Sequence, residues 1–209
     1  KSINLIISVL GLAALISCSQ PENTSNETNK DMKAENQVIE NIMSRRSIRK
    51  YKDGPVARET MDKILECGIN APSGMNRQSW EIRVIDNPET AAKFKEAMVK
   101  SNNDVKPEMV EGCFRGAPTL VFIANDPSYD FSPIDCGLLS ENIMLSAWSL
   151  GVGSVCLGSP IRYLAKSPEA IQMLGFSEGY VPIICIGLGY PNESPDAKPR
   201  DNAKIKYLD

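Results

Sequence analysis

The sequence contains no histidine among its 209 residues. This absence excludes the Ser-His-Asp and Cys-His arrangements of nucleophilic enzymes, in which a histidine takes up the proton. It also removes the most common zinc ligand in proteins. Chemistry in this chain therefore depends on carboxylates, lysines or thiols, or on a bound cofactor.

Other features are also missing. The net charge of −3 gives no reason to expect a nucleic-acid partner. The six cysteines form no C-x-x-C pair, which argues against a metal site and against a dithiol. No G-x-G-x-x-G fingerprint occurs, so a separate dinucleotide-binding domain is not expected.

The first eighteen residues are typical of a bacterial export signal. Ile3–Ser17 is an apolar run behind Lys1, shorter than the roughly 20 residues that span a bilayer. Its end, Leu15–Cys18, resembles the lipobox of bacterial lipoproteins, although a buried N-terminal helix ending in cysteine is the alternative. We expect residues 1–17 to be a signal peptide and Cys18 to carry a lipid. The protein would then be exported and anchored on the periplasmic or cell-surface side of a membrane.

The segment after Cys18 changes character. Residues 19–35 are polar apart from Met32 and Ala34 and contain one proline, so they cannot bury enough surface to repay the entropy of ordering. We therefore expect residues 18–35 to form a flexible tether and residues 36–209 to form one folded domain.

Helical and strand patterns mix within that domain. Apolar spacing predicts helices over about 36–46, from Pro55 to Ile69, from Asn87 past Met98, and over 135–150. The last is apolar on nearly every side, which favours a central helix or a subunit interface. Strands are expected at 80–84, 119–124, 155–157 and 180–188, with 119–124 in the centre. The pattern indicates an α+β domain with helices on both faces of a sheet.

Three polar clusters could carry function. Arg45, Arg46, Ser47 and Arg49 follow the first helix and could hold a phosphate, or could form a solvated helix end. The second cluster runs from Ala71 to Trp80. This loop is able to contact the edge of a planar polar ring, but taken alone it is better explained as an ordinary helix-to-strand connection. The third is Lys198-Pro199-Arg200, which in isolation is a charged tail.

Taken together and in chain order, these clusters resemble the nitroreductase family of flavoproteins. The resemblance continues at four further places: Asp135-Cys136-Gly137 leading to Ala147, Leu150–Ser154, Leu157-Gly158, and Gly187–Pro191. It covers Glu40 to Arg200. One departure is Ser79, where the family often has proline before the tryptophan.

The resemblance implies a fold and a cofactor. The expected fold is a three-layer α/β/α arrangement with a mostly antiparallel central sheet, in an intertwined homodimer with one FMN in each of two interface pockets. Arg45, Ser47, Lys198 and Arg200, with Arg46 in the same cluster, would hold the FMN phosphate, and Arg49 would lie at the pyrimidine end of the ring. The remaining expected contacts are Pro72, Ser73, Gly74, Met75 and Asn76 from the partner subunit, with Gln78 nearby, and Leu157, Gly158 and Ser159 beside the ring.

The resemblance also implies an activity. We expect an oxidoreductase that moves hydride from NAD(P)H through FMN to a nitroaromatic, quinone or similar planar acceptor by ping-pong kinetics, with no catalytic side chain. The alternatives are a flavin-fragmenting or dehalogenating reaction of the same superfamily, and a non-catalytic flavoprotein that relays electrons to a partner. Ring contacts from residues 100–118 are not assigned; Asn102, Asn103 and Lys106 are candidates.

Overall fold

The computed structural model describes residues 36–208. The expected signal peptide (1–17), the tether (18–35) and the lipidation site Cys18 lie outside the described residues. In the described part, no helix combines the length and the apolar character needed to cross a bilayer.

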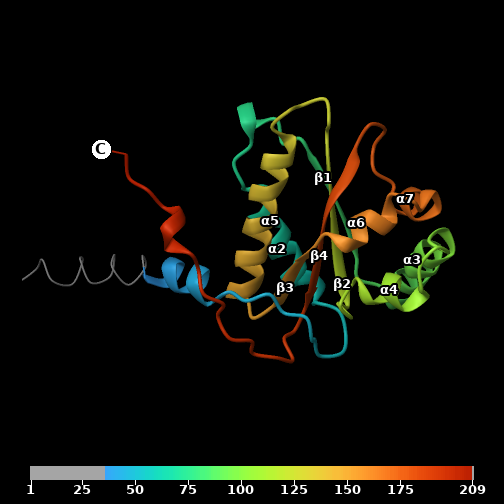
Figure 1. The fold of residues 1–209 in the computed structure, drawn as a ribbon, viewed down its shortest axis with the longest axis horizontal. Helices are drawn as coiled ribbons and strands as arrows, with labels where there is room; N and C mark the ends of the chain where they lie inside the picture. The colour runs from blue at the N-terminus through green and yellow to red at the C-terminus, as the bar shows by residue number, and fades with distance from the viewer. Residues whose placement is uncertain (1–35, 209) are drawn as a thin grey trace, which may run out of the picture. The chain divides into compact units, whose positions relative to one another are not determined.

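Helices and strands alternate along the domain (Figure 1). The helices are α2 (Arg58–Ile69), α3 (Pro88–Ser101), α4 (Pro107–Gly112), α5 (Ser132–Ser149), α6 (Ser159–Leu164) and α7 (Pro168–Leu174), with 3-10 helices η1 (Gly74–Asn76) and η2 (Asn202–Lys204). Residues 36–44 form a further helix. The strands are β1 (Trp80–Ile85), β2 (Thr119–Asn125), β3 (Gly153–Leu157) and β4 (Val181–Gly189).

The four strands form one sheet in the order β1-β2-β4-β3. All three pairings are antiparallel, as expected from the resemblance. Every residue of β2 is buried, because helices cover both of its faces and β1 and β4 flank it. The prediction of a central strand at 119–124 is therefore confirmed.

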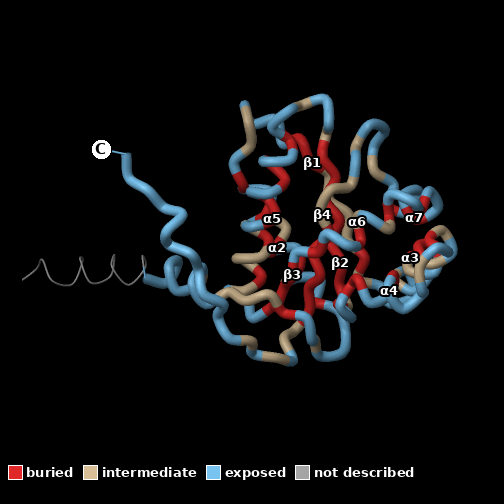
Figure 2. Tube along the Cα trace, viewed as in Figure 1, coloured by how far each residue is buried: buried red, intermediate tan, exposed pale blue. Residues whose placement is uncertain are grey.

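Helices on opposite faces of the sheet create two apolar cores, visible as buried segments in Figure 2. On one face α2 and α5 bring Met61 and Ile143 against Val121 of the sheet. On the other face α3, α4, α6 and α7 enclose a core that includes Phe94 and Phe122. The three-layer α/β/α arrangement is confirmed, because alternate residues of β2 point into different cores.

Several element boundaries differ from the expectation. α2 begins at Arg58 rather than at Pro55, because the backbone at Ala57 is still extended. α5 begins three residues before Asp135, with proline in its first turn. Helices α4, α6 and α7 were not predicted; they have six or seven residues each, too few for a clear periodic pattern, although each has a proline in its first turn.

The first helix ends at residue 44, two residues before the predicted end. Its apolar side chains do not enter the core of the described domain: Ile39, Ile42 and Met43 are between half and 70% exposed. Ile69, expected on the inner face of α2, is also half exposed. Amphipathic spacing thus predicted that these two helices exist, but it did not distinguish apolar side chains that face the core from those that are exposed.

Candidate functional site

The two ends of the domain meet around one small cavity of about 130 Å³. It is lined by Arg45, Arg46, Ser47, Arg49, Pro195, Asp196, Lys198 and Arg200. Two of the three polar clusters seen in the sequence therefore come together, although about 150 residues separate them. Five cationic side chains and one hydroxyl surround a space suited to a compact anion.

The segment after the first helix is held in place by β3. Ser47 forms a bridge to Ser154, and the Ile48 amide donates to the Ser154 carbonyl at 3.0 Å. Ile48 is fully buried against Gly153, where a Cβ atom would lie 2.8 Å from the Ile48 Cβ. The absence of a side chain at Gly153 thus allows the arginine-bearing segment to approach the sheet.

A second set of contacts joins this segment to the C-terminal tail. The Lys52 amide donates to the Tyr190 carbonyl at 2.8 Å, and the Asn192 amide donates to the Lys50 carbonyl at 2.9 Å. The Glu193 carboxylate accepts hydrogen bonds from the backbone amides of Arg49 and Lys50. Sequence analysis missed Glu193, which has no recognisable motif around it.

Tyr51 completes the support. Its hydroxyl donates to the Ile48 carbonyl at 2.6 Å and lies 3.4 Å from the Gly187 carbonyl. Burial, and then the charge of Glu193, raise the pKa of Tyr51 well above its ordinary value, so the phenol stays protonated and remains a donor. Tyr51 and Glu193 position the cationic segment.

The lining residues fit a phosphate ester. Within residues 36–208, none of the five cations forms an ion pair, although Asp196 also lines the cavity. Some of their capacity is used locally: Arg46 Nη1 donates to the Met43 carbonyl at 2.7 Å and caps the first helix. Five mutually repelling cations around so small a space are stabilised by a dianion such as a phosphate.

Strand β3 connects this cavity to the next group of expected site residues. Leu157 ends the strand, and Gly158 and Ser159 are exposed at the start of α6. At about 3.3 Å per residue, Gly158 lies roughly 13 Å along the chain from Ser154. The residues expected to contact the phosphate and the ring of a single ligand can therefore lie along β3.

The loop of the second polar cluster has an unusual backbone. Met75, Asn76 and Gln78 all adopt positive φ angles, 52°, 55° and 49°. This conformation costs on the order of 1 kcal/mol for each non-glycine residue. The Met75 side chain is nevertheless 76% exposed and contributes nothing to the core. Such a conformation persists only where surrounding contacts hold it, which makes this loop a candidate for a functional role.

This loop and the segment 45–49, which lines the cationic cavity, lie at opposite ends of α5 (Figure 1). Near the start of α5, Asp135 accepts a hydrogen bond from the Gly74 amide; near its end, Trp148 Nε1 donates to the Ser44 hydroxyl, next to Arg45. Thirteen residues of helix correspond to about 20 Å. The structure therefore does not bring the loop of one chain to the cavity of the same chain.

Of the candidates between residues 100 and 118, Asn102 is committed elsewhere. It is buried, and its amide donates to the carbonyls of Met98 and Tyr163 and to the Ser167 hydroxyl. Asn102 therefore ties the end of α3 to the α6–α7 region through its side-chain nitrogen, away from the cationic cavity.

A larger cavity of about 580 Å³ lies elsewhere, between α3, α4 and the residues around Pro55 and Pro118. Its lining includes Lys95, Glu96 and Glu111, so charges of both signs are present and no cations converge. For an anionic ligand we favour the smaller cavity, because five cationic side chains line it and the residues expected to hold a phosphate lie there.

The sequence is similar to those of known proteins. The profile of the nitroreductase family matches residues 42–190. A Methanothermobacter thermautotrophicus protein, named provisionally as an NADH dehydrogenase/NAD(P)H nitroreductase, is 35% identical over 171 residues, which is 77% of this chain and 81% of that protein. The FMN reductase [NAD(P)H] of Bacillus subtilis is 29% identical, over 79% of this chain and 70% of its own length.

A solved structure has the same fold. The crystal structure of a nitroreductase with bound FMN from Desulfitobacterium hafniense superimposes with a TM-score of 0.73 and 30% sequence identity. The match covers 83% of this chain and 98% of that one.

Proposed function

Because this chain belongs to the nitroreductase family, we propose that it works as an exported, lipid-anchored homodimer in which the two chains share each FMN site. The chain is an NAD(P)H-dependent FMN oxidoreductase. The observation that carries this function is the cationic cavity, in which Arg45, Ser47, Lys198 and Arg200 converge from the two ends of the domain.

In this proposal the chain supplies binding and electrostatics. Arg45, Ser47, Lys198 and Arg200 hold the phosphate, and Arg46 adds charge while it caps the first helix. Bound FMN would supply the redox chemistry, the passage of electrons from NAD(P)H to a planar acceptor. Arg49 would provide a fixed positive charge at the pyrimidine end of the ring, and the backbone of Leu157–Ser159 would offer a hydrogen-bond donor to flavin N5.

Two observations support the homodimer. A cavity of about 130 Å³ accommodates a phosphate, whereas ligands with a ring system occupy sites of about 300–1,000 Å³, so another surface must cover the ring. The loop expected to do this, Pro72–Gln78, lies about 20 Å from the cavity of its own chain. A partner chain would supply the loop and would also cover the exposed Ile42 and Met43.

Export and lipidation rest on the sequence of residues 1–18 alone. We expect a Cys18→Ser variant to leave the membrane fraction, while the unchanged protein stays in it after a salt wash. Equal membrane retention of the two proteins would rule out the anchor.

Flavin binding tests the function directly. The purified protein should bind FMN, and bound FMN should be bleached by NAD(P)H under anaerobic conditions. An Arg45→Ala, Arg200→Ala double variant should bind FMN at least about a hundredfold more weakly, because each charge-assisted hydrogen bond contributes about 1.5–3 kcal/mol. Lys93→Ala, Lys100→Ala removes two cations from α3 and serves as the control. A colourless protein that does not take up FMN would refute the proposal.

A further inference from the structure

One buried carboxylate holds both ends of the strained loop. Asp135, on the first turn of α5, is 2% exposed. Its Oδ1 accepts a hydrogen bond from the Gly74 amide at 3.0 Å, and its Oδ2 accepts one from the Ser79 hydroxyl at 2.9 Å. The Gly74 and Ser79 ends of the segment are thereby fixed to one rigid helix.

Other contacts fix the interior of the loop. The Ser73 hydroxyl accepts a hydrogen bond from the backbone amide of Gln78 at 3.0 Å, which closes the loop on itself. The guanidinium of Arg77 lies 4.4 Å from the ring centre of Tyr129. The Tyr129 hydroxyl also fills the space beside Gly74, where a Cβ atom would lie 2.0 Å from it. The contacts with Ser73 and Tyr129 therefore maintain the positive φ angles of the loop.

Among the described residues of a single chain, nothing reveals why the loop should be held so firmly. The loop leaves Met75 exposed, and its own cationic cavity is about 20 Å away along α5. A strained, rigidly supported loop with an exposed tip is suited to contact a surface or ligand outside its own chain.

We propose that Asp135 is a positioning residue that acts across the subunit boundary. It holds the Gly74–Gln78 loop of its own chain in the shape that covers the FMN of the partner. This inference rests on the proposed function, because it requires the shared FMN site. It assigns a role to a residue that does not itself touch the cofactor.

Complementation between two defective chains tests the inference. One chain carries Asp135→Ala, which releases the loop but leaves the phosphate cavity intact. The other carries Arg45→Ala and Arg200→Ala, which disable the cavity but leave the loop intact. The two chains are produced together with different affinity tags, and the mixed dimer is isolated by two successive purifications.

The two homodimers should each bind FMN at least about tenfold more weakly than the unchanged dimer. The mixed dimer should bind one FMN per dimer with an affinity within about threefold of the unchanged protein, because one of its two sites combines an intact cavity with an intact loop. Its NAD(P)H-dependent turnover should be about half that of the unchanged dimer. A residue that only stabilises its own chain would leave the mixed dimer without any normal site.

The outcomes separate the two proposals. If the unchanged protein takes up no FMN, the proposed function fails. If the unchanged protein binds FMN, both homodimers bind it poorly, and the mixed dimer also binds it poorly, the proposed function stands and the role of Asp135 across the boundary is overturned. Normal FMN affinity in the Asp135→Ala homodimer would also overturn it.

A second variant guards against misfolding of Asp135→Ala. Gly74→Ala keeps the Asp135 side chain but places a Cβ atom 2.0 Å from the Tyr129 hydroxyl, so the loop and the Tyr129 ring must move apart. It should show the same recovery in a mixed dimer with the cavity-deficient chain, and lack of recovery there would contradict the inference.

Asp135→Asn retains an acceptor for the Gly74 amide, and the Ser79 hydroxyl can turn to accept from the new amide. This homodimer should regain most of the FMN affinity lost in Asp135→Ala, and failure to do so would count against the loop support.

Discussion

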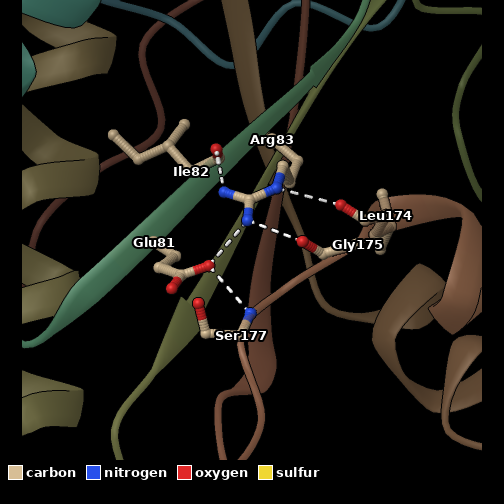
Figure 3. A network of polar contacts seen from close by, with 6 residues as sticks. All are labelled: Glu81, Ile82, Arg83, Leu174, Gly175 and Ser177. Carbon is tan, nitrogen blue, oxygen red and sulfur yellow. Dashed lines mark hydrogen bonds and ion pairs between the residues drawn. The ribbon is translucent and has the colours of Figure 1, made fainter.

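At the scale of single residues, Arg83 joins β1 to the end of α7 (Figure 3). Its Nε donates to the Leu174 carbonyl at 2.9 Å and its Nη2 to the Gly175 carbonyl at 2.7 Å. The same Nη2 pairs with Glu81 at 2.7 Å, and Glu81 also accepts from the Ser177 amide at 3.1 Å. These bonds satisfy carbonyl groups that the end of a helix leaves without partners.

This cluster predicts a contribution to acid sensitivity. Burial by itself would raise the pKa of Glu81, but hydrogen bonds from Ser177 and the charge of Arg83 outweigh it and lower the pKa. Since the folded state has the lower pKa, the stabilisation is present at neutral pH and is lost as the pH falls through that pKa. Glu81→Gln should therefore destabilise the protein at pH 7, and the difference from the unchanged protein should shrink as the pH falls below the ordinary pKa of glutamate. Urea unfolding over a series of pH values measures this, and a loss that does not change with pH would contradict it.

At the scale of elements, the packing of Ser47 and Ile48 against β3 depends on the absence of a side chain at Gly153. Gly153→Ala places a Cβ atom 2.7 Å from Ile48 Cγ1. We expect a loss of about 1–3 kcal/mol in the free energy of unfolding, because the fully buried Ile48 must move. FMN affinity should fall as well, since the same displacement moves Arg45 and Arg49.

Gly112→Ala, at the end of α4, is the matched control. A Cβ atom there would meet nothing within 4 Å, and alanine favours the helix, so stability should be unchanged or higher by up to about 1 kcal/mol. Chemical unfolding without FMN and a titration with FMN measure the two effects. Equal stability of both variants would show that Ile48 adapts without cost.

At the scale of the whole molecule, the exposed apolar side chains predict dimerisation. Met43 is 70% exposed in the first helix, and Tyr207 and Leu208 of the C-terminal tail are more than 90% exposed. Met43→Lys should weaken the dimer by at least about a hundredfold, because a subunit contact would then bury an unpaired charge. Size-exclusion chromatography with light scattering should show monomers that have lost FMN.

Met173→Lys provides the same chemical change on α7, where Met173 is 42% exposed. Because α7 lies on the opposite face of the sheet from α5, this variant should remain a dimer with normal FMN content. Dissociation of both variants, or of neither, would argue against an interface formed by the first helix.

The sequence by itself determined the longer elements and the class of chemistry, whereas the short helices α4, α6 and α7 escaped it. The central strand at 119–124, the long helix at 135–150 and the helix opened by Asn87 and Pro88 were predicted because periodicity and turn residues act within 10 to 20 neighbouring positions. The ordered polar clusters likewise indicated a flavoprotein of the nitroreductase family, which the comparisons confirmed.

The tertiary structure alone decided which distant residues cooperate. Glu193 supports the backbone of Arg49 from 144 positions away, and Asp135 supports Gly74 from 61 positions away. Neither contact leaves a pattern in the neighbouring sequence. A carboxylate that accepts a hydrogen bond from a backbone amide places no requirement on the type of residue that donates it. Likewise, only the folded chain places Asp135 and the loop at one end of α5 and Trp148, beside the cationic segment, at the other. That separation within one chain is the reason for our proposal that a second copy completes the site.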